Sequence, residues 1–173
     1  GNTLALEKAG LLHGLEVSPG NAVVMGDDGL ANGELNEAEA YNPLLRFGGL
    51  DRGMLGMTTG GEPDPKPTAD EFASDVRMVK DALKWCAQHG ITSIQNMDGN
   101  FYTFEILEEI QRDGDLLCRV KVPFHYKNFM KLDDLEKAST MTARYDTEWL
   151  SSGLVKMFYD GVLDGHTAYM LDG

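Results

Sequence analysis

Cysteine is scarce in this sequence: among 173 residues only Cys86 and Cys118 are cysteines, and both lie in apolar contexts. Their separation argues against a disulfide framework and against a cysteine-based zinc site. We expect two buried free thiols, which favours a reducing, cytoplasmic location. No apolar run approaches the ~20 residues of a membrane span, and the first residues do not form a signal peptide.

Positive charge is also in short supply. The chain has 15 Lys and Arg residues against 28 Asp and Glu residues, a formal net charge of −13. Such acidity argues against nucleic acid or an anionic membrane as a partner, and is typical of a soluble surface. With 42% hydrophobic and 25% charged residues, the composition is that of an ordinary globular protein.

Histidine is rare as well, with four residues and no His-x-His pair. The most informative stretch therefore carries a lysine. Residues 154–161 form an apolar run between two glycines, which predicts a buried strand with Lys156 inside it. A buried ammonium is costly unless it is paired or neutralised, although a lysine on an edge strand can extend its charge to solvent. A polar, glycine-rich loop follows at residues 160–168, where α/β proteins place their chemistry.

Three segments of the chain resemble amidohydrolase family 3. The segment around Lys156, Asp160 and Thr167 is similar to the family's V-K-x-x-x-D-G-x-x-x-x-x-T-A motif. Residues 2–10 resemble its N-x-x-A-L-x-x-A-G element, and residues 90–98 resemble its G-I-T-S-V-x-D strand. The three segments span almost the whole chain. The members of the family that they resemble are metal-dependent hydrolases similar to N-substituted formamide deformylase.

The resemblance implies an α/β fold, part of a (β/α)8 TIM barrel that stands beside a small β-sandwich in the family. It implies that Lys156 is carboxylated by carbon dioxide and becomes a metal ligand, most simply for zinc. Because the family's His-x-His pair and other histidine ligands are missing, we expect the chain to be an internal part of a larger enzyme. That enzyme would hydrolyse non-peptide, amide-type carbon–nitrogen bonds with metal-activated water. We expect no catalytic residue in this part of the enzyme, and no activity from it alone.

The pattern along the chain predicts two regions. Residues 1–67 read as an irregular, lid-like segment with short helices and a hairpin at Asp28, where turn chemistry explains the aspartate better than metal binding. Residues 68–173 read as βα units of an incomplete barrel. Within them we expect a helix at 68–88, with a capping box of Thr68 and Glu71 at its start and an apolar stripe along one face. We also expect helices at 102–112 and 133–145, strands at 91–97 and 116–122, and a lead-in at 147–152 to the lysine strand.

The substrate-side candidates are polar residues that follow these strands. Asp98 comes after the strand at 91–97, and either faces substrate or caps the next helix. His125 follows the strand at 116–122 on the same side as Asp98 if the strands are parallel, and its role is left open. The loop after the lysine strand adds Asp160, His166 and Thr167.

Two other functions are consistent with a lysine on a barrel strand. Lys156 could form a Schiff base with a carbonyl substrate, as in aldolases, and borohydride trapping would distinguish that chemistry from a carbamate. The chain could also be non-catalytic, with exposed strand edges that drive its self-association. In that case we expect a dimer or a larger assembly.

Overall fold

The computed structural model describes residues 1–49, 52, 62–163, 168–169 and 171. It divides the chain into two compact units. One consists of Gly1–Arg52 with Phe158–Gly173, and the other of Gly53–Met157. Among the described residues, no helix combines the length and hydropathy that crossing a membrane requires. The boundary that we expected after residue 67 stays a prediction.

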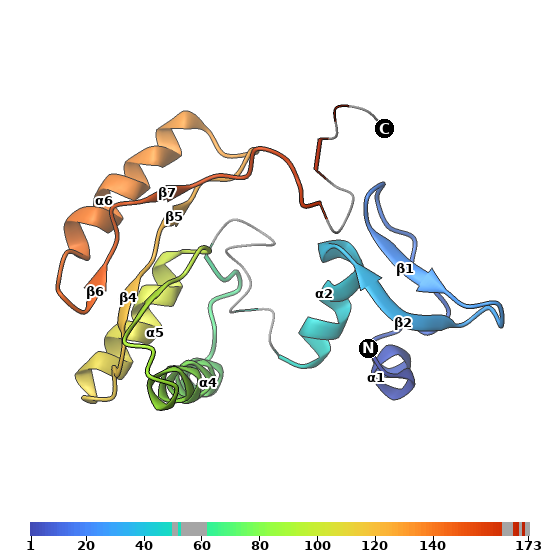
Figure 1. The fold of residues 1–173 in the computed structure, drawn as a ribbon, viewed down its shortest axis with the longest axis horizontal. Coiled ribbons are helices and arrows are strands. Elements are labelled where there is room, and N and C mark those ends of the chain that lie inside the picture. Colours follow the sequence, from blue (N-terminus) through green and yellow to red (C-terminus); the bar gives the residue numbers. More distant parts are fainter. Residues whose placement is uncertain (50–51, 53–61, 164–167, 170, 172–173) are drawn as a thin grey trace. The chain divides into compact units, whose positions relative to one another are not determined.

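The first unit is built on a β-hairpin with two helices. Strand β1 (Ala22–Met25) pairs antiparallel with β2 (Ala31–Asn36), and Figure 1 shows α1 (Thr3–Lys8) and α2 (Ala38–Phe47) beside it. The predicted turn is confirmed, because the Asp28 carboxylate accepts a hydrogen bond from the backbone of Leu30 at 3.0 Å. The small hydrophobic core of the first unit is formed by Leu6, Leu11 and Ala31.

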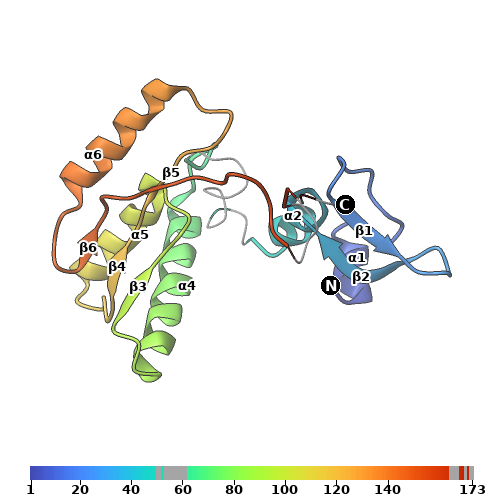
Figure 2. The ribbon, with the colours of Figure 1, turned by 45° about the horizontal axis from the view of Figure 1, so that its top comes forward.

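The second unit begins with the long helix α4 (Ala69–Gln88). Thr68 and Glu71 form the predicted capping box, in which each side chain accepts a hydrogen bond from the other residue's backbone. The predicted apolar stripe faces the core of this unit, where Val76 and Leu83 are buried. Helix α5 (Phe101–Arg112) lies alongside α4 in both views (Figures 1 and 2).

The strands of this unit are short, and all of them pair in parallel. β3 (Ser93–Gln95), β4 (Arg119–Lys121) and β6 (Leu150–Ser151) form a three-stranded sheet in the order β3-β4-β6. The predicted succession of strand, helix and strand is therefore confirmed. The described residues form no closed barrel.

A second, two-stranded sheet consists of β5 (Phe124–His125) and β7 (Val155–Lys156). The prediction of a buried strand over residues 154–161 is wrong, since the strand holds only Val155 and Lys156. Residues 157–160 are exposed, and Tyr159 is fully so. The prediction that residues 147–152 only lead into the lysine strand is also wrong, because β6 lies there and pairs with β4.

Helix α6 (Glu136–Arg144) connects the two sheets in sequence, after the 3-10 helix η1 (Leu132–Leu135). Figure 2 shows it apart from α4 and α5, beside the segment that carries β5. Its one buried residue, Met141, packs into the same core as α4 and α5. The fully buried side chains of that core are Phe104, Ile110, Cys118, Val122 and Met141.

Candidate functional site

The candidate site forms where the chain leaves one sheet and enters the other. Pro123 separates β4 from β5 and has no N–H to donate. Before it, the amide of Val122 donates to the carbonyl of Ser151 at 2.9 Å; after it, the amide of Phe124 donates to Leu154, also at 2.9 Å. The strand predicted over residues 116–122 thus continues as a second, offset strand.

The pairing of β5 with β7 brings His125 to Lys156. The two residues are partners in the parallel register, and the amide of Tyr126 donates to the Lys156 carbonyl at 2.9 Å. Because residues in register on parallel strands project to the same face, the imidazole and the lysine side chain share one side of this sheet. His125 is 1% exposed, whereas Lys156 is half-buried.

Asp98, in the loop after β3, contacts the imidazole of His125. One of its carboxylate oxygens, Oδ1, lies 2.7 Å from Nδ1 of His125. This side chain is 26% exposed, so the contact joins a partly solvated carboxylate to a buried imidazole. A carboxylate at Nδ1 favours the tautomer with a proton on that nitrogen and fixes the ring orientation.

Gly99 allows this close approach. A Cβ at this position would overlap the carbonyl oxygen of Pro123 and would lie 2.6 Å from Cγ1 of Val122. The Gly99 carbonyl also accepts a hydrogen bond from the His125 amide at 3.4 Å. The loop after β3 is therefore pressed against the junction of β4 and β5, which places Asp98 beside His125.

Lys127 is the fourth charged or titratable residue of this group. It follows His125 by two residues and is 8% exposed, with the less buried Tyr126 between them. The charge of Lys127 acts on His125, and the charges of Asp98 and Lys156 act on Lys127 in turn. We refer to Asp98, His125, Lys127 and Lys156 as the strand-end cluster.

Burial and neighbouring charges shift the pKa of two members of the strand-end cluster, His125 and Lys127. Burial lowers the pKa of His125, the charge of Lys127 lowers it further, and Asp98 acts in the opposite direction. Burial also lowers the pKa of Lys127, against the attraction of Asp98, and the charge of Lys156 adds to the lowering. Two ammonium groups, one imidazole and one carboxylate therefore lie close enough to interact electrostatically with one another.

The predicted site residues divide between the two units. Asp98 and Lys156 belong to the strand-end cluster, whereas Asp160 is exposed and lies in the other unit, where its carboxylate accepts a hydrogen bond from the Tyr169 amide at 2.9 Å. His166 and Thr167 lie outside the described residues. The roles assigned to all of them stay predictions.

The capping role considered for Asp98 is wrong. Asn100 caps α5, with its side-chain oxygen accepting from the Thr103 amide at 2.8 Å. Glu62 supports the same helix end, since its carboxylate accepts from the amides of Phe101 at 2.6 Å and Tyr102 at 2.7 Å. The sequence analysis missed Glu62, because it precedes the helix by about forty positions and no local pattern joins the two.

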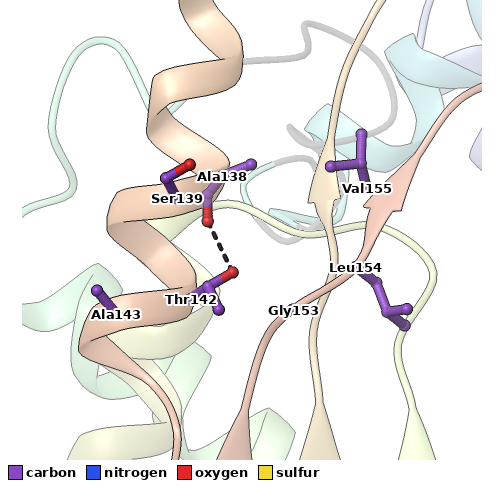
Figure 3. Close-up of a pocket in the computed structure, with 7 residues that line it drawn as sticks. All are labelled: Ala138, Ser139, Thr142, Ala143, Gly153, Leu154 and Val155. Atoms are coloured by element: carbon purple, nitrogen blue, oxygen red, sulfur yellow. Dashed lines mark hydrogen bonds between the residues drawn. The ribbon is translucent and has the colours of Figure 1, made fainter.

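Two of the cavities in the described part of this unit have linings that include no member of the strand-end cluster. Figure 3 shows an open groove of about 420 Å³ between α6 and residues 153–155. Its hydroxyl at Thr142 already donates to the Ala138 carbonyl at 2.8 Å, and its lining has no titratable side chain. A second cavity of about 350 Å³, between α4, α5 and the sheet, is lined mainly by apolar side chains. Neither lining offers groups for hydrolysis.

Among the described residues, no group of three or more His, Cys, Asp or Glu side chains could hold a metal ion. Lys156 fits as one ligand if it is carboxylated, because a carbamate presents anionic oxygens at the end of β7. Asp98 and His125 are already in contact through Oδ1 and Nδ1, so these two atoms are less available as metal ligands than two separate side chains would be.

Comparison with known proteins gives one match. The model described as the amidohydrolase family matches residues 1–173, which is the whole chain. No curated protein and no solved structure gives a significant match.

Proposed function

Because the chain belongs to the amidohydrolase family, we propose that Lys156 is carboxylated and binds a divalent metal in a hydrolase that cleaves amide-type, non-peptide carbon–nitrogen bonds. The family supports a metal-dependent hydrolase in general. Zinc as the metal and a substrate similar to an N-substituted formamide are the finer parts of the proposal. They follow from the motif around Lys156 and Asp160 in the sequence.

The observation that supports this function most is the position of Lys156 itself. Its strand is paired in register with β5, and its side chain shares a face with the buried His125. A half-buried ammonium beside the charge of Lys127 is unfavourable, because two like charges in a partly desolvated place repel each other. Conversion of Lys156 to an anion would turn this repulsion into attraction.

The conversion is a simple addition. The neutral amine of Lys156 attacks the carbon of carbon dioxide, and the new N–C bond forms as one C=O electron pair moves to oxygen. The nitrogen then releases a proton to solvent, which leaves a carbamate anion. A divalent metal bound by this anion would supply Lewis-acid chemistry and an activated water.

The other residues of the strand-end cluster shape the surroundings of this group. Asp98 holds the ring of His125, and Gly99 lets the loop that carries Asp98 reach it. At 1% exposure, the imidazole of His125 is itself shielded from bulk water. The buried side of the lysine strand is therefore preorganised before any metal binds.

The test is to detect the carbamate on the protein. After incubation with ¹³C-labelled bicarbonate and zinc, we expect a carbamate carbonyl resonance by NMR and the added mass of one carbon dioxide on the peptide that contains Lys156. The Lys156→Arg variant should lose both. Lys121→Arg, at a half-buried lysine of β4, is the matched control and should keep both.

The opposite outcome would show another chemistry. A signal that persists in Lys156→Arg, or no carbamate in the native protein at saturating bicarbonate and zinc, would overturn the proposal. Trapping of a carbonyl compound on Lys156 by borohydride would instead support a Schiff-base lysine.

A further inference from the structure

Lys127 is a buried lysine that no step of the proposed function uses. It is 8% exposed, although lysine is seldom buried this far, and it lies in the segment that directly follows β5. Burial disfavours its ammonium and the charge of Lys156 adds to this effect, whereas Asp98 attracts it.

The backbone brings the segment that carries Lys127 beside the segment that carries Lys156. Tyr126, between His125 and Lys127, donates its amide to the carbonyl of Lys156 at 2.9 Å, so the two segments are still side by side at this point. His125 is in register with Lys156, and both His125 and Lys127 are buried. Lys127 therefore lies directly beyond the pair that His125 and Lys156 form.

The charges of these residues also support an interaction between Lys127 and Lys156. Lys156 acts electrostatically on both His125 and Lys127, and Asp98 acts on both as well. Carboxylation changes the charge of Lys156 from +1 to −1. A fixed positive charge nearby therefore favours the carbamate twice, because it destabilises the ammonium and stabilises the anion.

We propose that Lys127 is a positioning residue whose ammonium holds the carboxylated form of Lys156, and this inference rests on the proposed function. Lys127 pairs with the carbamate and keeps it oriented on the face shared with His125. Charge-assisted hydrogen bonds of this kind are among the stronger ones in proteins, and both partners here are withdrawn from bulk water.

The experiment measures how much bicarbonate the protein needs for carboxylation. The native protein and three variants are titrated with ¹³C-labelled bicarbonate, with and without zinc, and the carbamate resonance is integrated. In Lys127→Met we expect the bicarbonate concentration for half-carboxylation to rise about tenfold, or about 1.4 kcal/mol. Lys127→Arg, which keeps the charge, should restore most of the carbamate.

The third variant is the matched control. Lys84 is an exposed lysine on α4, and Lys84→Met removes the same charge from the chain without touching the strand-end cluster. It should titrate like the native protein. Circular dichroism and urea unfolding of each variant show whether Lys127→Met is folded, and the recovery in Lys127→Arg separates charge from packing.

Each result bears on one of the two proposals. Equal titration of Lys127→Met and the native protein would overturn the role of Lys127 while carboxylation of Lys156 stands. Loss of the carbamate in both Lys127→Met and Lys127→Arg would also overturn it, because charge would then not be the cause. Absence of any carbamate in the native protein would overturn the proposed function and this inference with it.

Discussion

Replacement of Gly99 by alanine should destabilise the unit that carries the strand-end cluster. The added methyl group would overlap the carbonyl oxygen of Pro123 and crowd Cγ1 of Val122 at 2.6 Å. The oxygen belongs to the backbone between β4 and β5, so no change of rotamer can relieve the overlap. The loop after β3 must therefore move away from the junction at Pro123.

The magnitude follows from two opposing effects. Overpacking in a well-packed region costs about 1–3 kcal/mol, and a backbone obstacle places this site at the upper end of that range. Movement of the loop also breaks the hydrogen bond from the His125 amide to the Gly99 carbonyl. The lower backbone entropy of unfolded alanine returns about 0.4–1 kcal/mol. We expect a net loss of about 3 kcal/mol.

Urea unfolding followed by circular dichroism measures this loss. Gly90→Ala and Gly114→Ala are the matched controls, since a Cβ at either position meets nothing within 4 Å. Both glycines have positive φ angles, of 76° and 80°, so alanine there should cost only about 1–2 kcal/mol of backbone strain. If Gly99→Ala unfolds at the urea concentration of the native protein, or loses less than either control, the close packing at Pro123 is refuted.

Three further predictions concern the same unit. Thr68→Ala removes the capping box with Glu71 and should lower the free energy of unfolding by about 1 kcal/mol in urea unfolding; an unchanged midpoint would contradict it. Tyr102→Phe removes a buried 2.6 Å hydrogen bond to Asp75 and should cost about 1–3 kcal/mol in the same assay, whereas a neutral effect would show that the bond contributes nothing. Burial lowers the pKa of His125, so the unfolded chain takes up a proton first, and the free energy of unfolding should fall as pH drops below about 6.5. His125→Gln should flatten this dependence, and an identical pH profile would contradict the assignment.

Helix α4 and the alternation of strands and helices along the chain could be predicted because the responsible residues are local. The capping box at Thr68 and the apolar stripe of α4 are each contained in a few turns of helix, and the helix positions were correct to within a few residues. The succession of strand, helix and strand then follows from the connection rules for parallel sheets.

The strand-end cluster was only partly predictable, because it depends on a change of pairing at Pro123. A proline after an apolar run indicates the end of a strand, yet the chain resumes pairing at once with a different partner, β7. Lys127 follows β5 and is buried, and no local pattern could distinguish it from a solvated lysine. The contact of Asp98 with His125 likewise depends on how the Gly99 loop packs.

The hydrogen bond from the Tyr126 amide to the Lys156 carbonyl gives the protein an internal reporter. Its amide exchanges with deuterium only when β5 and β7 separate, so its protection factor measures how often the lysine strand detaches. Any ligand that binds beside Lys156 should slow that exchange, even before its chemical identity is known. A single backbone proton thus makes a screen for ligands possible without a known substrate.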